Sequence, residues 1–188
     1  MNEMDAAPGW WGHVPPDVQA VLPSIASDGR QSMRYLVGML ENRCPQRRWK
    51  EYEAEDYLIA WGTWRGAICG LKSAIESGGF VVAVEFMPVG DGRTKRVCRS
   101  RNGLFIPLDE PLLWQNLPPL HWGCRSTLSP ISEFECSPAR LAAKLECARK
   151  KLATLQPLPN GFGALQPAGF EAALQWVETM EGRPLMSP

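Results

Sequence analysis

The chain has 188 residues, of which 45% are hydrophobic, so it is long enough to bury one sizeable core and we expect one main domain. Twenty basic residues are matched by twenty acidic ones, and the sequence pI is about 6.7. No overall electrostatic field therefore attracts the chain to nucleic acid or to an anionic membrane surface, and any nucleic-acid contact must be local.

The first residues, Met1 to Trp10, lack a basic region followed by an apolar one, and no apolar run approaches the roughly 18–20 residues of a membrane-spanning helix. We therefore expect a soluble, cytosolic protein with no membrane partner. The six cysteines do not suggest a disulfide framework in such a chain, because reducing compartments keep thiols free. We expect most of them to be buried thiols, with two or three as candidate metal ligands.

Residues 1–48 are expected to form an N-terminal arm and one helix. The stretch from Ala6 to Pro16 has no period of 2 or 3.6 residues, and we expect it to dock Trp10 or Trp11 on the core. From Gly29 to Asn42, apolar residues recur at helical spacing, which predicts a helix that Pro45 ends or bends.

Residues 49–136 are expected to form the core domain, and the first element in this range is a long helix. Apolar residues at helical spacing predict it from about Trp49 to Ser77, with two glycines as its stop. Within it, Gly62, Gly66 and Gly70 each cost about 1 kcal/mol relative to alanine, which we interpret as one helix face packed very closely against a neighbour. The β-branched and aromatic run from Phe80 to Met87 predicts a strand.

Residues 137–188 are expected to form a C-terminal helical extension. Ser137 and Pro138 are typical of an N-cap with proline at the first helical position, and the leucines that follow predict an amphipathic helix packed on the main core, with Leu141, Leu145 and Leu152 inward. A Pro/Gly-rich linker, 156–169, separates it from a last short helix near 170–180. The fold class is therefore α+β, with N-terminal helices, a small antiparallel sheet of three or four strands with Pro-rich loops, and C-terminal packing helices.

The segment from Asp91 to Pro130 carries three features in a fixed order. The first is an Asp-x-Arg-Thr turn directly after the predicted strand, with a cysteine four residues beyond the threonine. The second is an Asn-Gly turn followed by an Asp-x-Pro-x-x-Trp stretch, and the third is a Pro-Pro pair leading into His-Trp and then Cys-Arg-Ser-Thr. The residues involved are Asp91, Arg93, Thr94, Cys98, Asn102, Gly103, Asp109, Pro111, Trp114, Pro118, Pro119, His121, Trp122, Cys124, Arg125, Ser126 and Thr127.

This segment resembles the core of the Mu F-like minor head proteins of tailed phages, the head morphogenesis family. The resemblance covers about forty residues well and extends back through the helix and strand between Tyr57 and Met87. The chain departs from the family pattern at Ser126, where family members carry a further cysteine. It also departs in size, because only about ninety residues precede the Asp-Gly-Arg-Thr turn, whereas family members carry a long region that engages the portal.

The same segment contains a candidate metal site. His121 and Cys124 are three residues apart and can chelate one ion from a single turn, and Cys98 can reach that ion if the strand and turn fold back. Such a set is typical of zinc, but a closed structural zinc site takes four ligands and Ser126 is a poor one, so Asp91 or water would complete the shell. The alternative is that the cysteines are small buried residues and that His121 is held by a backbone hydrogen bond.

The other polar motif residues have two readings. In the first, their side chains hydrogen-bond a Pro-rich loop, which has few backbone donors, to its neighbours. In the second, they bind phosphate. We favour the first, structural role. A basic run beside them is a candidate nucleic-acid surface, whose contacts would position rather than specify sequence, although such runs are more often solvated faces. The structural or phosphate-binding candidates are Asp91, Arg93, Thr94, Arg125 and Thr127, and the nucleic-acid candidates are Lys95, Arg96, Arg99 and Arg101.

The resemblance implies a phage or prophage minor head protein with a structural and interaction role in capsid assembly or genome delivery. Its partners would be the portal or other head proteins, with weak DNA contact, first in the host bacterial cytoplasm and then in the virion. The runner-up is a metal-dependent nuclease or toxin-like effector that carries an F-like domain, for which the sequence offers no evident general base. A third reading is a prophage-derived adaptor that binds a protein through exposed tryptophans.

Overall fold

The computed structural model describes residues 7–26, 31–135, 137–155, 158, 161–162 and 169–182. It has the α+β architecture that the sequence predicts, with three antiparallel strands. The strands are β1 (Val81–Met87), β2 (Leu104–Pro107) and β3 (Thr127–Ser132). The helical elements are the 3-10 turn η2 (Gly9–His13), α1 (Pro16–Gln19), α2 (Leu22–Ala26), α3 (Met33–Arg43), α4 (Glu53–Glu76), α5 (Arg96–Arg99), α6 (Leu112–Gln115), α7 (Pro138–Ala153) and α8 (Phe170–Glu181).

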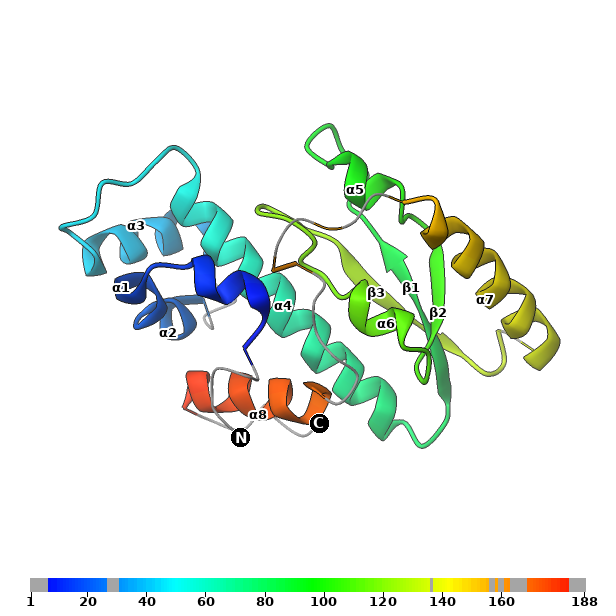
Figure 1. Cartoon of the computed structure of the whole chain (residues 1–188). Helices are drawn as coiled ribbons and strands as arrows, with labels where there is room; N and C mark the ends of the chain where they lie inside the picture. Colours follow the sequence, from blue (N-terminus) through cyan, green and yellow to red (C-terminus); the bar gives the residue numbers. More distant parts are fainter. Residues whose placement is uncertain are drawn as a thin grey trace.

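Helix α4 crosses the middle of the molecule and separates a helical half from the sheet (Figure 1). Helices α1, α2, α3 and α8 lie on one side of it, the sheet lies on the other, and α7 lies beyond the sheet. The strand order is β2-β1-β3, so β1 is central. No helix in the described part of the chain is long and apolar enough to cross a membrane.

The two faces of the sheet bury different apolar sets. Side chains alternate along a strand, so Val84 and Phe86 of β1 face the main core. Ala83 points to the opposite face, where it packs with Phe105 of β2 in a second, smaller cluster. Leu141 of α7 packs against this second cluster. The sheet is thus enclosed by α4 on one face and by α7 on the other.

The long helices lie where the sequence predicts, although α3 and α4 each begin four residues later than expected, at Met33 and Glu53. Glu53, Glu55 and Asp56 in the first turn of α4 complement the positive end of the helix dipole, and the chain leaves the helix through glycines with positive φ. The Ser137 hydroxyl caps α7 by accepting a hydrogen bond from the Arg140 amide at 3.4 Å. On α7, Leu152 packs against the main core, while Leu141 reaches the second cluster and Leu145 is half-buried.

Tryptophans from both ends of the chain meet on α4. The ring of Trp11 lies 5.3 Å from that of Trp61 on α4 and 5.2 Å from that of Trp176 on α8. Trp10 and Trp11 are only 1% and 5% exposed, so the N-terminal arm docks both of its tryptophans. The ranges 1–48, 49–136 and 137–188 therefore contribute to one main core.

Close packing along the glycine row of α4 is not found, and that interpretation of the sequence is wrong. Gly62, Gly66 and Gly70 are exposed, and a Cβ built on any of them meets no atom within 4 Å. Gly62 and Gly66 instead line an open groove bordered by α2, α3 and the start of β3. The linker predicted at 156–169 lies largely outside the described residues, as does Cys136.

Candidate metal centre

The three predicted ligands come together from two separate parts of the chain. Cys98 lies on α5, whereas His121 and Cys124 lie in the loop between α6 and β3. The Sγ atom of Cys98 is 3.2 Å from His121 Nε2 and 3.6 Å from Cys124 Sγ. All three side chains are buried, and their ligand atoms lie within 4.8 Å of one another. The described residues hold no other group of three such side chains close enough to share an ion.

The orientation of His121 suits a metal ligand. Its Nδ1 atom lies 2.6 Å from the carbonyl oxygen of Trp122, which can only accept, so Nδ1 carries the proton and Nε2 turns its lone pair toward the thiols. A metal-bound histidine has this arrangement, with the second ring nitrogen donating to a carbonyl or carboxylate.

The two ligand spacings that involve Cys98 are close to those of a zinc site. Zinc–ligand bonds of about 2.3 Å to sulfur and 2.0–2.1 Å to nitrogen place tetrahedral ligand atoms about 3.5–3.8 Å apart. The sulfur pair, at 3.6 Å, is within this range, and the sulfur–nitrogen pair, at 3.2 Å, needs only a small expansion. The donor set and its geometry therefore form a candidate metal site.

The two thiols shift each other's pKa in opposite directions. A hydrogen bond from Cys98, together with the backbone amides of Leu120 and Ser126, lowers the pKa of Cys124 to about 5 against the opposing effect of burial. The same hydrogen bond, together with burial, raises the pKa of Cys98. The opposite shifts have one cause, the contact between the two sulfur atoms, which makes Cys124 the more acidic thiol. The thiolate is the form of cysteine that binds a metal.

The Ser126 side chain lies next to the three ligands. This side chain is 5% exposed, and its hydroxyl hydrogen-bonds to both thiols, lowering the pKa of each. Asp91, the other candidate for the fourth ligand, instead directs its carboxylate to Arg125, with nitrogen–oxygen distances of 2.7 and 2.8 Å. The chain thus supplies three strong ligands and one hydroxyl.

Asp91, the first residue of the motif, is the centre of a hydrogen-bond network. Besides the two contacts from Arg125, its Oδ1 accepts from the Arg93 amide at 3.0 Å and from the Thr94 hydroxyl at 3.1 Å. The bond from Arg125 lowers the pKa of the Asp91 carboxyl. Arg125 thereby joins the loop before β3 to the turn after β1, which supports the structural reading. Thr127 is exposed at the start of β3.

The candidate nucleic-acid residues do not form one surface. The Lys95 ammonium donates to the Trp122 carbonyl at 3.1 Å and Arg99 donates to the Asp91 carbonyl at 3.2 Å, both at exposed positions. Arg96 is also exposed. Arg101 is only 4% exposed and donates to Asn116 Oδ1, so it is a buried structural arginine and is withdrawn from the nucleic-acid set.

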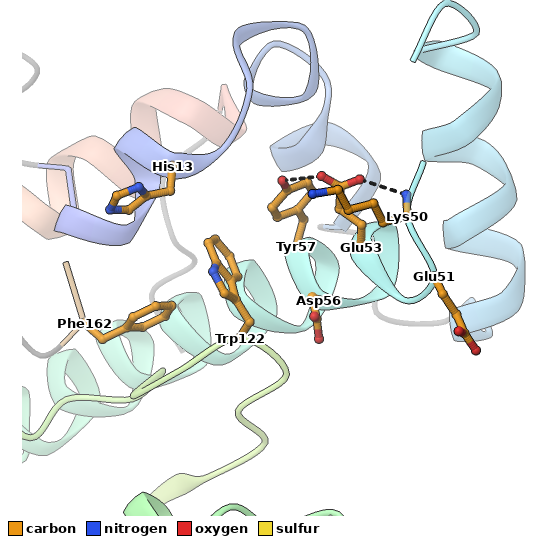
Figure 2. A pocket seen from close by; sticks show the side chains of 8 residues that line it. All are labelled: His13, Lys50, Glu51, Glu53, Asp56, Tyr57, Trp122 and Phe162. Carbon is orange, nitrogen blue, oxygen red and sulfur yellow. Dashed lines mark hydrogen bonds between the residues drawn. The ribbon is translucent and has the colours of Figure 1, made fainter. Parts of the chain in front are cut away.

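Sequence reasoning missed a pocket lined by Trp122, the residue directly after His121 (Figure 2). Gly123, at φ +70°, faces Asp56 of α4 so closely that an added Cβ would lie 2.7 Å from Asp56 Oδ1, which explains glycine at this position. Burial raises the pKa of the Asp56 carboxyl. The position of Trp122 directly after His121 was the one available signal, because it placed an aromatic ring next to the predicted ligands.

Comparison of the chain with protein-family models, with curated proteins and with solved structures gives no match. The assignment of function therefore depends on the motif and on the geometry of its residues.

Proposed function

We propose that the chain is a phage or prophage minor head protein with a structural and interaction role in capsid assembly or genome delivery, and that Asp91–Pro130 is its zinc-tied structural unit. The observation that carries the proposal is the meeting of the motif's separate parts at one buried cluster. Cys98 and Cys124 are 26 residues apart in sequence, yet their sulfur atoms lie 3.6 Å apart.

The contacts around the cluster support a structural role. The segment contains several prolines, which lack an amide donor, so side chains must supply ties that a backbone ladder would otherwise give. Arg125 supplies one through Asp91, and the Thr63 hydroxyl of α4 supplies another by donating to the Cys124 carbonyl at 2.8 Å. Hydrogen bonds thus connect parts of the motif with each other and with the central helix α4.

Zinc would be held by Cys98, His121 and Cys124, with Ser126 or a water that it orients at the fourth position. When bound, the ion supplies a strong cross-link between α5 and the loop before β3. The chain's own contribution is to orient His121 through the Trp122 carbonyl and to lower the pKa of Cys124.

Metal analysis of the purified protein tests the zinc assignment. We expect close to one zinc per chain in the parent, loss of the metal in Cys124→Ser, and a lower melting temperature for this variant. Cys147→Ser is the matched control, because Cys147 is exposed on α7 and lies outside the cluster. A parent without metal, or a Cys124→Ser protein that is as stable as the parent, would contradict the zinc-tied unit.

The head-protein assignment is tested by following the chain during lytic growth of a phage or induced prophage that encodes it. We expect it first in the bacterial cytoplasm and then in few copies in purified heads, together with the portal. Exposed Lys95, Arg96 and Arg99 provide weak local contacts to packaged DNA. Purified heads that lack the chain would count against this role.

The second candidate function is a metal-dependent nuclease or toxin-like effector, and Ser126 is the observation that favours it. A zinc held by three protein ligands keeps an open position, as catalytic zinc sites do. Incubation with plasmid DNA and divalent metals separates the two functions. Cutting by the parent, with a stable but inactive Cys124→Ser variant, would replace the structural proposal by the enzymatic one.

A further inference from the structure

A pocket of about 440 Å³ lies at the start of α4 and is bordered by Trp122 (Figure 2). Its volume is within the range of small-ligand sites, about 300–1,000 Å³. Four parts of the chain form its walls: the N-terminal arm, the start of α4 with the residues just before it, the loop after His121, and Phe162 between α7 and α8. The lining residues are His13, Lys50, Glu51, Glu53, Asp56, Tyr57, Trp122 and Phe162.

One wall of the pocket is a rigid aromatic surface. The Trp122 ring is 5.2 Å from the Tyr57 ring and 5.3 Å from the Phe162 ring, and both contacts are edge-to-face. Tyr57 and Phe162 are 7% and 6% exposed, so they hold Trp122 in place from both sides. Trp122 itself is only partly buried, and its ring borders the pocket.

The acidic groups around this wall differ in their contacts. Glu53 is already engaged, because it accepts hydrogen bonds from Arg47 at 2.8 Å, from the Lys50 amide at 3.0 Å and from the Tyr57 hydroxyl at 2.9 Å. Asp56 is half-buried, and Lys95 and Arg93 act on its carboxylate electrostatically, but neither forms a hydrogen bond or ion pair with it in the described part of the chain. A partly desolvated carboxylate beside an aromatic face is an environment that attracts a cation.

The chain already uses this combination for one of its own arginines. The guanidinium of Arg47 lies 5.2 Å from the centre of the Trp49 ring and donates to Glu53 at 2.8 Å. The pocket repeats the pattern with Trp122 as the ring and Asp56 as the carboxylate, and no arginine is among its lining residues. Lys50 and Glu51, one basic and one acidic, also line the pocket.

We propose that this pocket binds the guanidinium group of an arginine side chain presented by a protein partner. A guanidinium is planar, so it stacks on an indole and at the same time donates two parallel hydrogen bonds to a carboxylate, which a compact ammonium cannot do. The site lies outside the Cys98/His121/Cys124 cluster, and this inference goes beyond the proposed head-protein role and does not require zinc.

Titration of the full chain with blocked arginine (N-acetyl-arginine N-methylamide) tests the proposal. We expect saturable shifts of the Trp122 indole N–H signal in NMR spectra, with the neutral isostere citrulline, blocked in the same way, binding at least tenfold more weakly. The lysine analogue and tetramethylammonium should also bind more weakly. Equal binding of citrulline or of tetramethylammonium would overturn the guanidinium assignment.

Two substitutions on α4 locate the site. Asp56→Asn should weaken binding of the blocked arginine at least tenfold without changing zinc content. Glu55→Gln should leave binding unchanged, because Glu55 pairs with Arg93 and does not line the pocket. Unchanged affinity of Asp56→Asn would overturn the proposal. If Asp56→Asn does not fold, the NMR signal shifts of the parent protein test the proposal instead. Shifts confined to residues other than Trp122 and Tyr57 would then overturn the proposal.

A final comparison separates the two sources of a guanidinium. A peptide with a central arginine and blocked ends should bind at least as tightly as free arginine if a protein partner presents the group. Free arginine binding tenfold more tightly than the peptide would instead indicate a small-molecule site and overturn the partner assignment.

Discussion

The aromatic core around α4 and the Asp91–Pro130 unit are stabilised in different ways. In the core, Trp10, Trp11, Trp61 and Trp176 are almost wholly buried, and their ring contacts join both ends of the chain to the central helix. The Asp91–Pro130 unit has buried residues too, but its loops are positioned by individual polar contacts at Asp91, His121 and Cys124.

The difference predicts how each region responds to substitution. Burial of apolar area is non-directional, so a core tolerates a change of shape better than a loss of volume. A polar network depends on particular atoms, and removal of one partner leaves the other without its hydrogen bonds. Substitutions in the core should therefore affect stability in proportion to the volume removed, whereas substitutions in the motif should depend on pH or metal.

The largest effect is expected for Trp61→Ala. Trp61 is fully buried and its ring contacts those of Trp11 and Trp176, so its loss should lower the free energy of unfolding by about 3–5 kcal/mol. Urea denaturation measures this change. The control is Tyr35→Ala on α3, where a side chain 52% exposed should change stability by less than about 0.5 kcal/mol. Similar losses for the two variants would contradict the aromatic core.

A smaller, pH-dependent effect is expected for Asp91→Asn. The pKa of Asp91 is lowered from its ordinary value of 3.8 by Arg125, so the folded chain binds the proton less readily than the unfolded chain. The tie therefore contributes stability above about that pH and loses it as the pH falls further. Denaturation at pH 7 and at pH 3 should show a difference between parent and variant at pH 7 that shrinks at pH 3.

Asp109→Asn serves as the control for this pH dependence, because Asp109 is exposed and lies outside the contacts with Arg125. The opposite outcome is that the free energies of unfolding of the parent and of Asp91→Asn differ by the same amount at both pH values. That result would show that the Asp91–Arg125 ion pair contributes nothing to stability.

The smallest effect is a gain in stability from Gly66→Ala. The space around this position on α4 is open, so alanine should raise the free energy of unfolding by about 0.5–1 kcal/mol through its better helix propensity. Gly123→Ala should do the opposite, because φ is +70° there and the new Cβ would lie 2.7 Å from Asp56 Oδ1. Thermal unfolding compares the two. A destabilised Gly66→Ala protein would mean that the groove beside it is filled.

Periodicity and capping predicted the long elements well. Helix α4, strand β1 and the Ser137 cap of α7 all follow local rules, and the structure has them where expected. The meeting of Cys98 with His121 and Cys124 was anticipated only through the family resemblance, because spacing alone does not say which distant segments fold together.

The misses have a common physical origin. Burial of Arg101 depends on Asn116, a partner fifteen positions away, and the basic run around Arg101 looks like a solvated face in sequence. The open glycine row and the role of Asp56 likewise depend on what lies opposite α4. Such properties depend on tertiary packing, so neither secondary-structure propensity nor hydrophobic periodicity can predict them.

The contact between Cys98 and Cys124 also has a consequence for chain entropy. In an unfolded chain, bringing together two residues 26 positions apart costs about 3.5 kcal/mol of loop-closure entropy. In the folded chain that loop, which contains β2 and α6, is already closed by packing before any ion binds. Metal affinity should therefore be much higher for the folded protein than for the isolated segment, and each measurement of it is also a measurement of folding.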